Sequence, residues 1–193
     1  MEATGQPVAW IIAKPSGTEL RLARRAFVAA SHLGGEFASG ELGTTVTLNV
    51  PHLTIELLYP PLPDIASLCG AIGQVASRHA PCRVPALGVA REDARSVAIE
   101  LALTAELAAL RSEIAGAIRQ VGGHPHADPD GTWRPHLSVI GREDLGDKWM
   151  ERVHPESVLA GFRFAVGSLT LSLPADEPGQ FREFGPYRLQ ALR

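Results

Sequence analysis

The strongest constraint in the sequence is a five-residue pattern that occurs twice. Residues 51–55 are Pro-His-Leu-Thr-Ile and residues 135–139 are Pro-His-Leu-Ser-Val, and apolar, strand-forming residues follow both. A proline disfavours helical geometry in the residue before it, so each histidine is expected on or entering a strand. The chain is therefore expected to contain two similar strands that begin with the same side chains.

Side chains in a strand alternate between its two faces, and this separates each motif into a core side and a polar side. His52 and Thr54 share one face, and His136 and Ser138 share the equivalent face in the second motif. The leucine between them and the aliphatic residue after them point the other way, into a core. Each motif thus presents an imidazole with a hydroxyl two residues later.

If the two motifs pack around a pseudo-twofold axis, two imidazoles and two hydroxyls meet in one cleft. This set suits cleavage of a phosphodiester without a metal ion. A neutral imidazole takes a proton from water or a ribose hydroxyl, while a protonated one gives a proton to the leaving oxygen. The ordinary pKa of histidine, about 6.5, allows both states near neutral pH. The hydroxyls would donate hydrogen bonds to the non-bridging oxygens in the transition state.

The rest of the chain alternates strand patterns with helix patterns, and several connections look like hairpins. This mixture predicts an α+β fold with antiparallel sheets. Four helices are predicted, two of them at residues 18–33 and 147–159. A third has Ile65, Leu68, Ile72 and Val75 on one face. The fourth is capped by Thr104 and has an apolar stripe at Leu107, Leu110, Ile114, Ile118 and Val121. The predicted strands are residues 8–13, 46–59, 84–90, 97–103, 135–140, 162–166, 169–173 and 187–192.

Composition is that of an ordinary globular protein, with 45% hydrophobic and 20% charged residues among 193. A net charge of −3 argues against a protein that coats long stretches of nucleic acid. A nucleic-acid partner would therefore bind at a local site. No apolar stretch approaches the about 20 residues of a membrane span, and the N-terminus lacks a signal-peptide pattern. A cytoplasmic protein without a membrane partner is expected, with Cys69 and Cys82 as reduced thiols.

Two His-x-(Thr/Ser) motifs at this separation, in a chain of this length, resemble the 2H phosphoesterase superfamily. Within it the sequence is similar to the 2′-5′ RNA ligase-like cyclic phosphodiesterases of bacteria and archaea, over nearly the whole chain. The resemblance implies one domain over residues 1–193, a bilobal, pseudo-twofold-symmetric α+β fold with helices outside two antiparallel sheets and a central cleft. The two lobes would carry the motifs at residues 52–55 and 136–139.

The same resemblance implies hydrolysis of 2′,3′-cyclic phosphates to 2′-phosphates, or of related cyclic or 2′-5′-linked nucleotides, with a reversible 2′-5′ ligase activity and without cofactor or metal. His52 and His136 match the catalytic histidines, and Thr54 and Ser138 match the phosphate-binding hydroxyls. By analogy His52 is expected to be the acid and His136 the base. The expected partner is an RNA end with a cyclic phosphate, or a small cyclic or 2′-5′-linked nucleotide.

Further residues are candidates for substrate contacts. Ser138 stands where the family more often has threonine, a change that keeps the hydroxyl donor but loosens its rotamer. Arg142 is a candidate for phosphate binding, although it lies one position from the family's usual basic residue. Tyr59, Trp133 and Tyr187 are candidates for stacking on a base.

Two other functions stay open at this point. One is a non-catalytic module that binds nucleotides or RNA in the same cleft. The other is a metallohydrolase that uses His124, His126, Asp128 and Asp130. A loop with two prolines does not place these four residues in the fixed geometry of a catalytic zinc site, so no metal site is expected. For the oligomeric state, a monomer is the default expectation.

Overall fold

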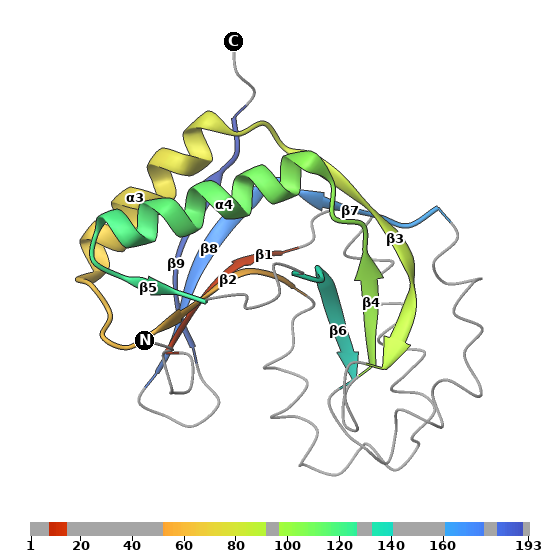
Figure 1. The fold of residues 1–193 in the computed structure, drawn as a ribbon, viewed down its shortest axis with the longest axis horizontal. Helices are drawn as coiled ribbons and strands as arrows, with labels where there is room; N and C mark the ends of the chain where they lie inside the picture. Colours follow the sequence, from red (N-terminus) through yellow and green to blue (C-terminus); the bar gives the residue numbers. More distant parts are fainter. Residues whose placement is uncertain are drawn as a thin grey trace.

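The computed structural model describes residues 8–14, 52–91, 97–126, 133–140, 161–175 and 181–190, and the fold is that of these residues. They form nine strands and two helices around one strongly curved sheet (Figure 1). The strands are β1 (Ala9–Ala13), β2 (Leu53–Tyr59), β3 (Cys82–Arg91), β4 (Val97–Leu101), β5 (His124–Pro125), β6 (His136–Ile140), β7 (Arg163–Val166), β8 (Ser168–Pro174) and β9 (Phe181–Arg188), and the helices are α3 (Ile65–Arg78) and α4 (Ala105–Gln120).

The sheet consists of two four-stranded antiparallel halves. The first half has the strand order β9-β8-β1-β2 and the second has the order β6-β4-β3-β7, while the short β5 pairs with β2. In the described residues, one pair joins the halves, Leu53 of β2 opposite Leu137 of β6. The strands β1 and β2 of the first half correspond to β4 and β6 of the second. The predicted α+β fold with antiparallel sheets is confirmed, and the two sheets are joined edge to edge.

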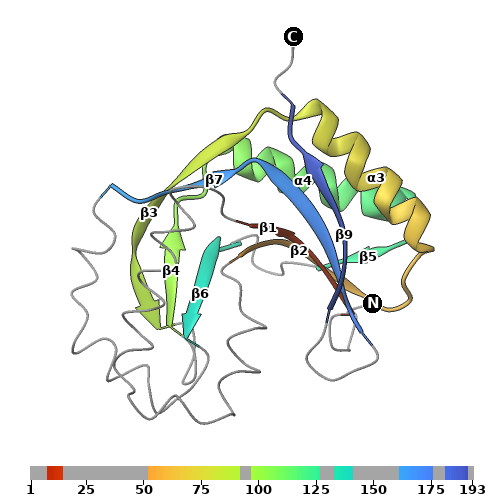
Figure 2. The ribbon, with the colours of Figure 1, turned by 180° about the vertical axis from the view of Figure 1, so that it is seen from behind.

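The chain does not complete one half before it starts the other. From β2 it continues through α3 to β3 in the second half, and β8 and β9 return to the first half. Gly167 alone separates β7 from β8. A nearly continuous strand therefore runs from the second half into the first (Figure 2).

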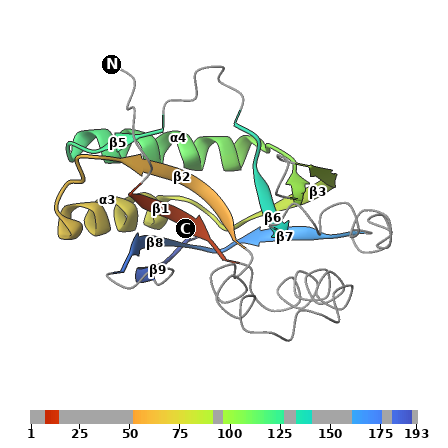
Figure 3. The ribbon, with the colours of Figure 1, turned by 90° about the horizontal axis from the view of Figure 1, so that it is seen from below.

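Both helices lie next to each other over the first half of the sheet (Figure 3). A side chain caps the N-terminus of each helix. In α3 the Asp64 side chain accepts the backbone N–H of Ser67, and in α4 the Thr104 side chain accepts that of Leu107. Apolar side chains at helical spacing face the sheet, as predicted. The buried helix residues are Leu68, Ala71, Ile72, Val75 and Ala76 in α3, and Leu107, Leu110, Ile114, Ala115 and Ile118 in α4.

The structure corrects the predicted strands at three places. The last strand spans residues 181–188 rather than 187–192, because it lies at the edge of the described sheet with mostly exposed side chains and therefore lacks apolar alternation. β4 ends at Leu101, and the side chain of Leu103 is 48% exposed. The two-residue strand β5 was not predicted. The helices predicted at residues 18–33 and 147–159 lie outside the described residues.

The described residues also bear on the predictions about the two cysteines and about membrane spans. Cys69 and Cys82 are free thiols, and both are half-buried. No helix in the described ranges is long and apolar enough to cross a bilayer.

Replacing Leu53 by alanine is expected to lower the free energy of unfolding by about 2–5 kcal/mol, because its side chain is fully buried where the two halves meet. The matched control is Leu87→Ala, whose leucine is 69% exposed and whose loss is expected to change stability by less than about 0.5 kcal/mol. Urea denaturation of both variants measures the difference. Equal effects would contradict the burial of Leu53 at the junction.

Candidate active site

The pairing of Leu53 with Leu137 brings the two histidine motifs together. Both leucines are buried, with exposed fractions of 0% and 1%, so the residues beside them point to the opposite face of the sheet. One step along the antiparallel pair places Thr54 opposite His136. His52 lies two residues before Thr54 on the same face. The two histidines are therefore diagonal neighbours, and residues in such positions have Cα atoms about 7–8 Å apart.

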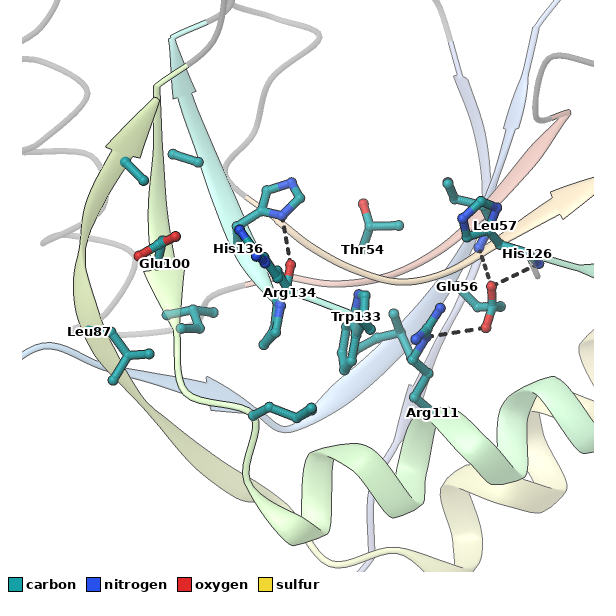
Figure 4. A pocket seen from close by; sticks show the side chains of 16 residues that line it. Thr54, Glu56, Leu57, Leu87, Glu100, Arg111, His126, Trp133, Arg134 and His136 are labelled. Carbon is teal, nitrogen blue, oxygen red and sulfur yellow. Dashed lines mark hydrogen bonds and ion pairs between the residues drawn. The ribbon is translucent and has the colours of Figure 1, made fainter. Parts of the chain in front are cut away.

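A cavity of about 780 Å³ opens beside these strands (Figure 4). This volume is within the range of about 300–1,000 Å³ that is typical of small-molecule sites. Apolar side chains of β3, β4 and the segment before α4 form one wall of the cavity. The polar and charged residues of the lining are Thr54, Glu56, Glu100, Arg111, His126, Arg134 and His136.

The predicted motif residues take different positions relative to this cavity. Thr54 and His136 line it, and Figure 4 shows their side chains on the same side of β2 and β6. His52 is half-buried and is not part of the lining, although it precedes Thr54 on the same face. Ser138 lies on β6, where its backbone pairs with Ala98 of β4, and its side chain is outside what the structure describes.

A hydrogen bond sets the tautomer of His136. Its Nδ1 lies 2.9 Å from the carbonyl oxygen of Arg134. A carbonyl oxygen only accepts, so Nδ1 carries the hydrogen and donates it. The neutral ring therefore has an unprotonated Nε2, and the imidazolium has an Nε2–H. The same nitrogen takes a proton in one state and gives it in the other.

A buried ion pair forms the wall of the cavity nearest α4. Glu56 of β2 is 2% exposed, and its Oε2 lies 3.4 Å from Nε of Arg111 on α4. Its Oε1 accepts the backbone N–H groups of Leu57 and His126, each at 3.0 Å. Burial raises the pKa of the Glu56 carboxyl, while Arg111 and the two backbone donors act against this rise. The carboxylate thus ties β2 to α4 and to the end of β5.

The ion pair also supports the aromatic residue of the cavity. The guanidinium carbon of Arg111 lies 4.7 Å from the centroid of the Trp133 ring, a cation–π contact. Sequence reasoning did not select Glu56 or Arg111. The sequence does contain a signal for Glu56, which is a charged residue inside an apolar run. In the same strand, Ile55 and Leu58 are fully buried. Trp133, in contrast, was a predicted candidate and lines the cavity.

The other predicted contact residues lie elsewhere. Tyr59 stacks on His126, with ring centroids 5.7 Å apart and its hydroxyl 3.1 Å from Nδ1 of that histidine. Tyr187 packs against α3 near Gly73, and burial together with a hydrogen bond to Cys69 raises its pKa to about 12. The structure does not bring Tyr187 to the cavity. Arg142 lies outside the described residues.

The loop proposed as an alternative metal site is described only in part. His124 is exposed, and Nδ1 of His126 faces the hydroxyl of Tyr59. In the described part of the chain, no three His, Cys, Asp or Glu side chains come together as metal ligands. Asp128 and Asp130 lie outside it.

Comparison with known proteins connects this geometry to a family. The family model of the 2′-5′ RNA ligase superfamily matches residues 29–176. The fold is similar to that of E. coli LigT in complex with 3′-AMP, with 15% identity, a TM-score of 0.55, and 92% of this chain and 93% of that chain covered. It is also similar to TT0787 of Thermus thermophilus, with 15% identity, a TM-score of 0.64, and 94% and 97% covered. A comparison with curated protein sequences finds no match.

The matched segment is most of the chain, and both histidine motifs fall inside it. The similar structures share the fold, in which an antiparallel sheet curves beneath two helices. Motifs, fold and family model agree, and the chain belongs to the 2′-5′ RNA ligase superfamily of the 2H phosphoesterases.

Proposed function

We propose that the protein is a metal-independent cyclic phosphodiesterase that hydrolyses 2′,3′-cyclic phosphates, at RNA ends or on small nucleotides, to 2′-phosphates. The observation that carries the proposal is the register of β2 and β6, which sets His52, Thr54 and His136 on one face of the sheet. Membership of a phosphoesterase superfamily supports phosphoester chemistry. The structures of LigT with 3′-AMP, ATP and NADP⁺ support a nucleotide as the ligand.

The reaction needs one proton to leave the attacking group and one to reach the leaving group. One imidazole removes a proton from water as the water oxygen bonds to phosphorus, and the other gives a proton to O3′ as the P–O3′ bond breaks. A separation of about 7–8 Å between the histidine positions leaves space for a phosphate between them. Thr54 donates a hydrogen bond to a non-bridging oxygen. With a 5′-hydroxyl in place of water, the same steps would form a 2′-5′ linkage.

The cavity favours a small reacting group over a long nucleic acid. Its volume of about 780 Å³ suits a nucleotide or a short RNA end. Its described lining includes two arginines and two glutamates, so these residues give no excess of positive charge. Binding of extended RNA depends on many phosphate contacts from cations. A mononucleotide or the terminal nucleotide of an RNA is the substrate expected here.

Phosphorus NMR of a 2′,3′-cyclic nucleotide, incubated with the protein in excess EDTA, tests the reaction. The wild type is expected to form a 2′-phosphate, and His52→Ala and His136→Ala are each expected to lower the rate by about 10²–10⁴-fold because each removes a proton-transfer group. His124→Ala is the matched control, since this exposed histidine lies outside the cavity lining. Loss of turnover in EDTA, or in the control alone, would favour the metallohydrolase. Nucleotide binding that survives in all variants without any product would favour the binding module.

The hydroxyl of Thr54 is expected to matter only in the transition state. Thr54→Val keeps the shape of the side chain but removes the donor, and it is expected to lower kcat by about 10²-fold with little change in KM. Thr54→Ser keeps the hydroxyl and is expected to stay much closer to the wild type. Steady-state kinetics of the pair separate the hydroxyl from the shape. Equal losses in both variants would assign Thr54 a packing role.

The pH dependence of kcat/KM is expected to be bell-shaped. One imidazole must be neutral and the other protonated, so the rate falls on both sides of an optimum, with limbs displaced around a histidine pKa of about 6.5. Initial rates between about pH 4.5 and about pH 9.5 measure the profile, a range that spans both limbs. A rate that rises to a plateau and stays there at high pH would contradict acid–base catalysis by two histidines.

A further inference from the structure

The cavity contains a third histidine that the proposed reaction does not use. His126 directly follows the short strand β5, which pairs with β2, and its backbone N–H donates to the carbonyl oxygen of Leu57 at 2.9 Å. This bond continues the register of β5 and β2 by one residue, so His126 and Leu57 are opposite each other and share a face of the sheet. Both residues line the cavity.

An irregularity in β2 turns Leu57 to the same face as Thr54. Regular alternation over three residues would place the two side chains on opposite faces. Ile12 and Ile11 are adjacent on β1, but their partners on β2 are Thr54 and Glu56, so β2 contains one extra residue at this point. Glu56 therefore points towards α4, and the face that carries Thr54 continues at Leu57 and at the histidine opposite it.

The spacing along β2 places His126 beyond Thr54. Leu57 pairs with Trp10 and Thr54 pairs with Ile12, so the two positions are separated by two residues of β1. At about 3.3 Å per residue this is about 7 Å. Figure 4 shows Thr54 between His136 and His126. In the proposed reaction the cyclic phosphate is bound at Thr54, and a similar distance separates successive phosphates of an extended RNA strand.

Contacts with β2 hold the ring of His126 in place. Its Nδ1 lies 3.1 Å from the hydroxyl of Tyr59, and the two rings are stacked. Its backbone N–H also donates to Oε1 of Glu56 at 3.0 Å. Since Nδ1 contacts the tyrosine, Nε2 is the ring nitrogen that can reach a ligand. When the hydroxyl donates to Nδ1, the neutral ring carries its hydrogen on Nε2, and the protonated ring carries one there as well.

The two described carboxylates of the cavity lining leave this end open to an anion. The Oε2 of Glu56 lies 3.4 Å from Nε of Arg111, and its Oε1 accepts two backbone N–H groups. The negative charge of Glu56 is therefore already compensated. The second carboxylate, Glu100, is on β4 in the other half of the sheet. A second phosphate of the substrate is thus favoured at His126 and disfavoured beside Glu100.

We infer that His126 binds the 5′-phosphate of the nucleotide whose 2′,3′-cyclic phosphate reacts. The inference rests on the proposed function and narrows its substrate to RNA ends and 5′-phosphorylated nucleotides, in preference to nucleosides with a free 5′-hydroxyl. The Nε2–H of His126 donates to a phosphate oxygen and touches no reacting atom. Tyr59 is a positioning residue that acts through the ring of His126.

Two substrates that differ in one group test the contact. They are adenosine 2′,3′-cyclic phosphate with a 5′-hydroxyl and the same nucleotide with a 5′-phosphate, compared by steady-state kinetics at constant ionic strength. The wild type is expected to have a KM about tenfold lower for the 5′-phosphorylated substrate, with a similar kcat, because a hydrogen bond to a charged group holds ground state and transition state equally. In His126→Ala the ratio of the two KM values is expected to fall to about one.

Three further variants separate the contact from the fold around it. His126→Gln keeps an N–H donor and is expected to retain part of the preference. Tyr59→Phe keeps the stacked ring without its hydroxyl and is expected to lower the preference by about threefold. His124→Ala is the matched control, because this exposed histidine is two residues earlier on the same strand and outside the cavity lining. It is expected to keep the preference of the wild type.

Binding of reaction products tests the same contact without turnover. Calorimetry of the wild type is expected to show adenosine 2′,5′-bisphosphate bound about tenfold more tightly than adenosine 2′-phosphate, and His126→Ala is expected to bind both alike. A wild type that turns over neither cyclic substrate would refute the proposed function. The calorimetric comparison would still decide whether His126 binds a second phosphate.

Three results would overturn the inference. The first is a wild type that does not distinguish the 5′-phosphate from the 5′-hydroxyl. The second is a His126→Ala variant that keeps the preference, or loses it no more than His124→Ala does. The third is a KM that rises equally for both substrates in His126→Ala, which would assign the histidine a structural role.

Discussion

Among the residues that the structure describes, the antiparallel pair of Leu53 with Leu137 sets the register between the two halves of the sheet, and the geometry of the polar face follows from it. Side chains alternate along a strand, so a slip of one residue in either strand would turn its histidine towards the core and its leucine towards the cavity. Burial of each leucine side chain is worth about 1.5–3 kcal/mol, which opposes such a slip. The apolar side of the junction therefore determines where the imidazoles lie.

Much of this arrangement could be predicted from the sequence, because it depends on local patterns. The repeated motif predicted two strands with matching faces. Apolar spacing predicted both described helices, and the cap at Thr104 predicted where α4 begins. The pairing of Glu56 with Arg111 could not be predicted in this way, since β2 and α4 meet only after folding. Tyr187 was a candidate for base stacking, but its ring packs against α3 at Gly73, where the glycine has no side chain. β9 was misplaced because an exposed edge strand has no buried face to impose alternation.

Gly167 has a mechanical consequence. Because it is the only residue between β7 and β8, the chain passes from one half of the sheet to the other almost without interruption. Swinging the halves apart would have to bend this strand at one residue, while the pairs that β7 makes with β3 and β8 makes with β1 resist displacement on either side. The two described halves of the sheet are therefore held at a fixed spacing beside the cavity and do not open and close around it. A ligand that fits the existing spacing of the described strands needs no movement of the sheet when it binds.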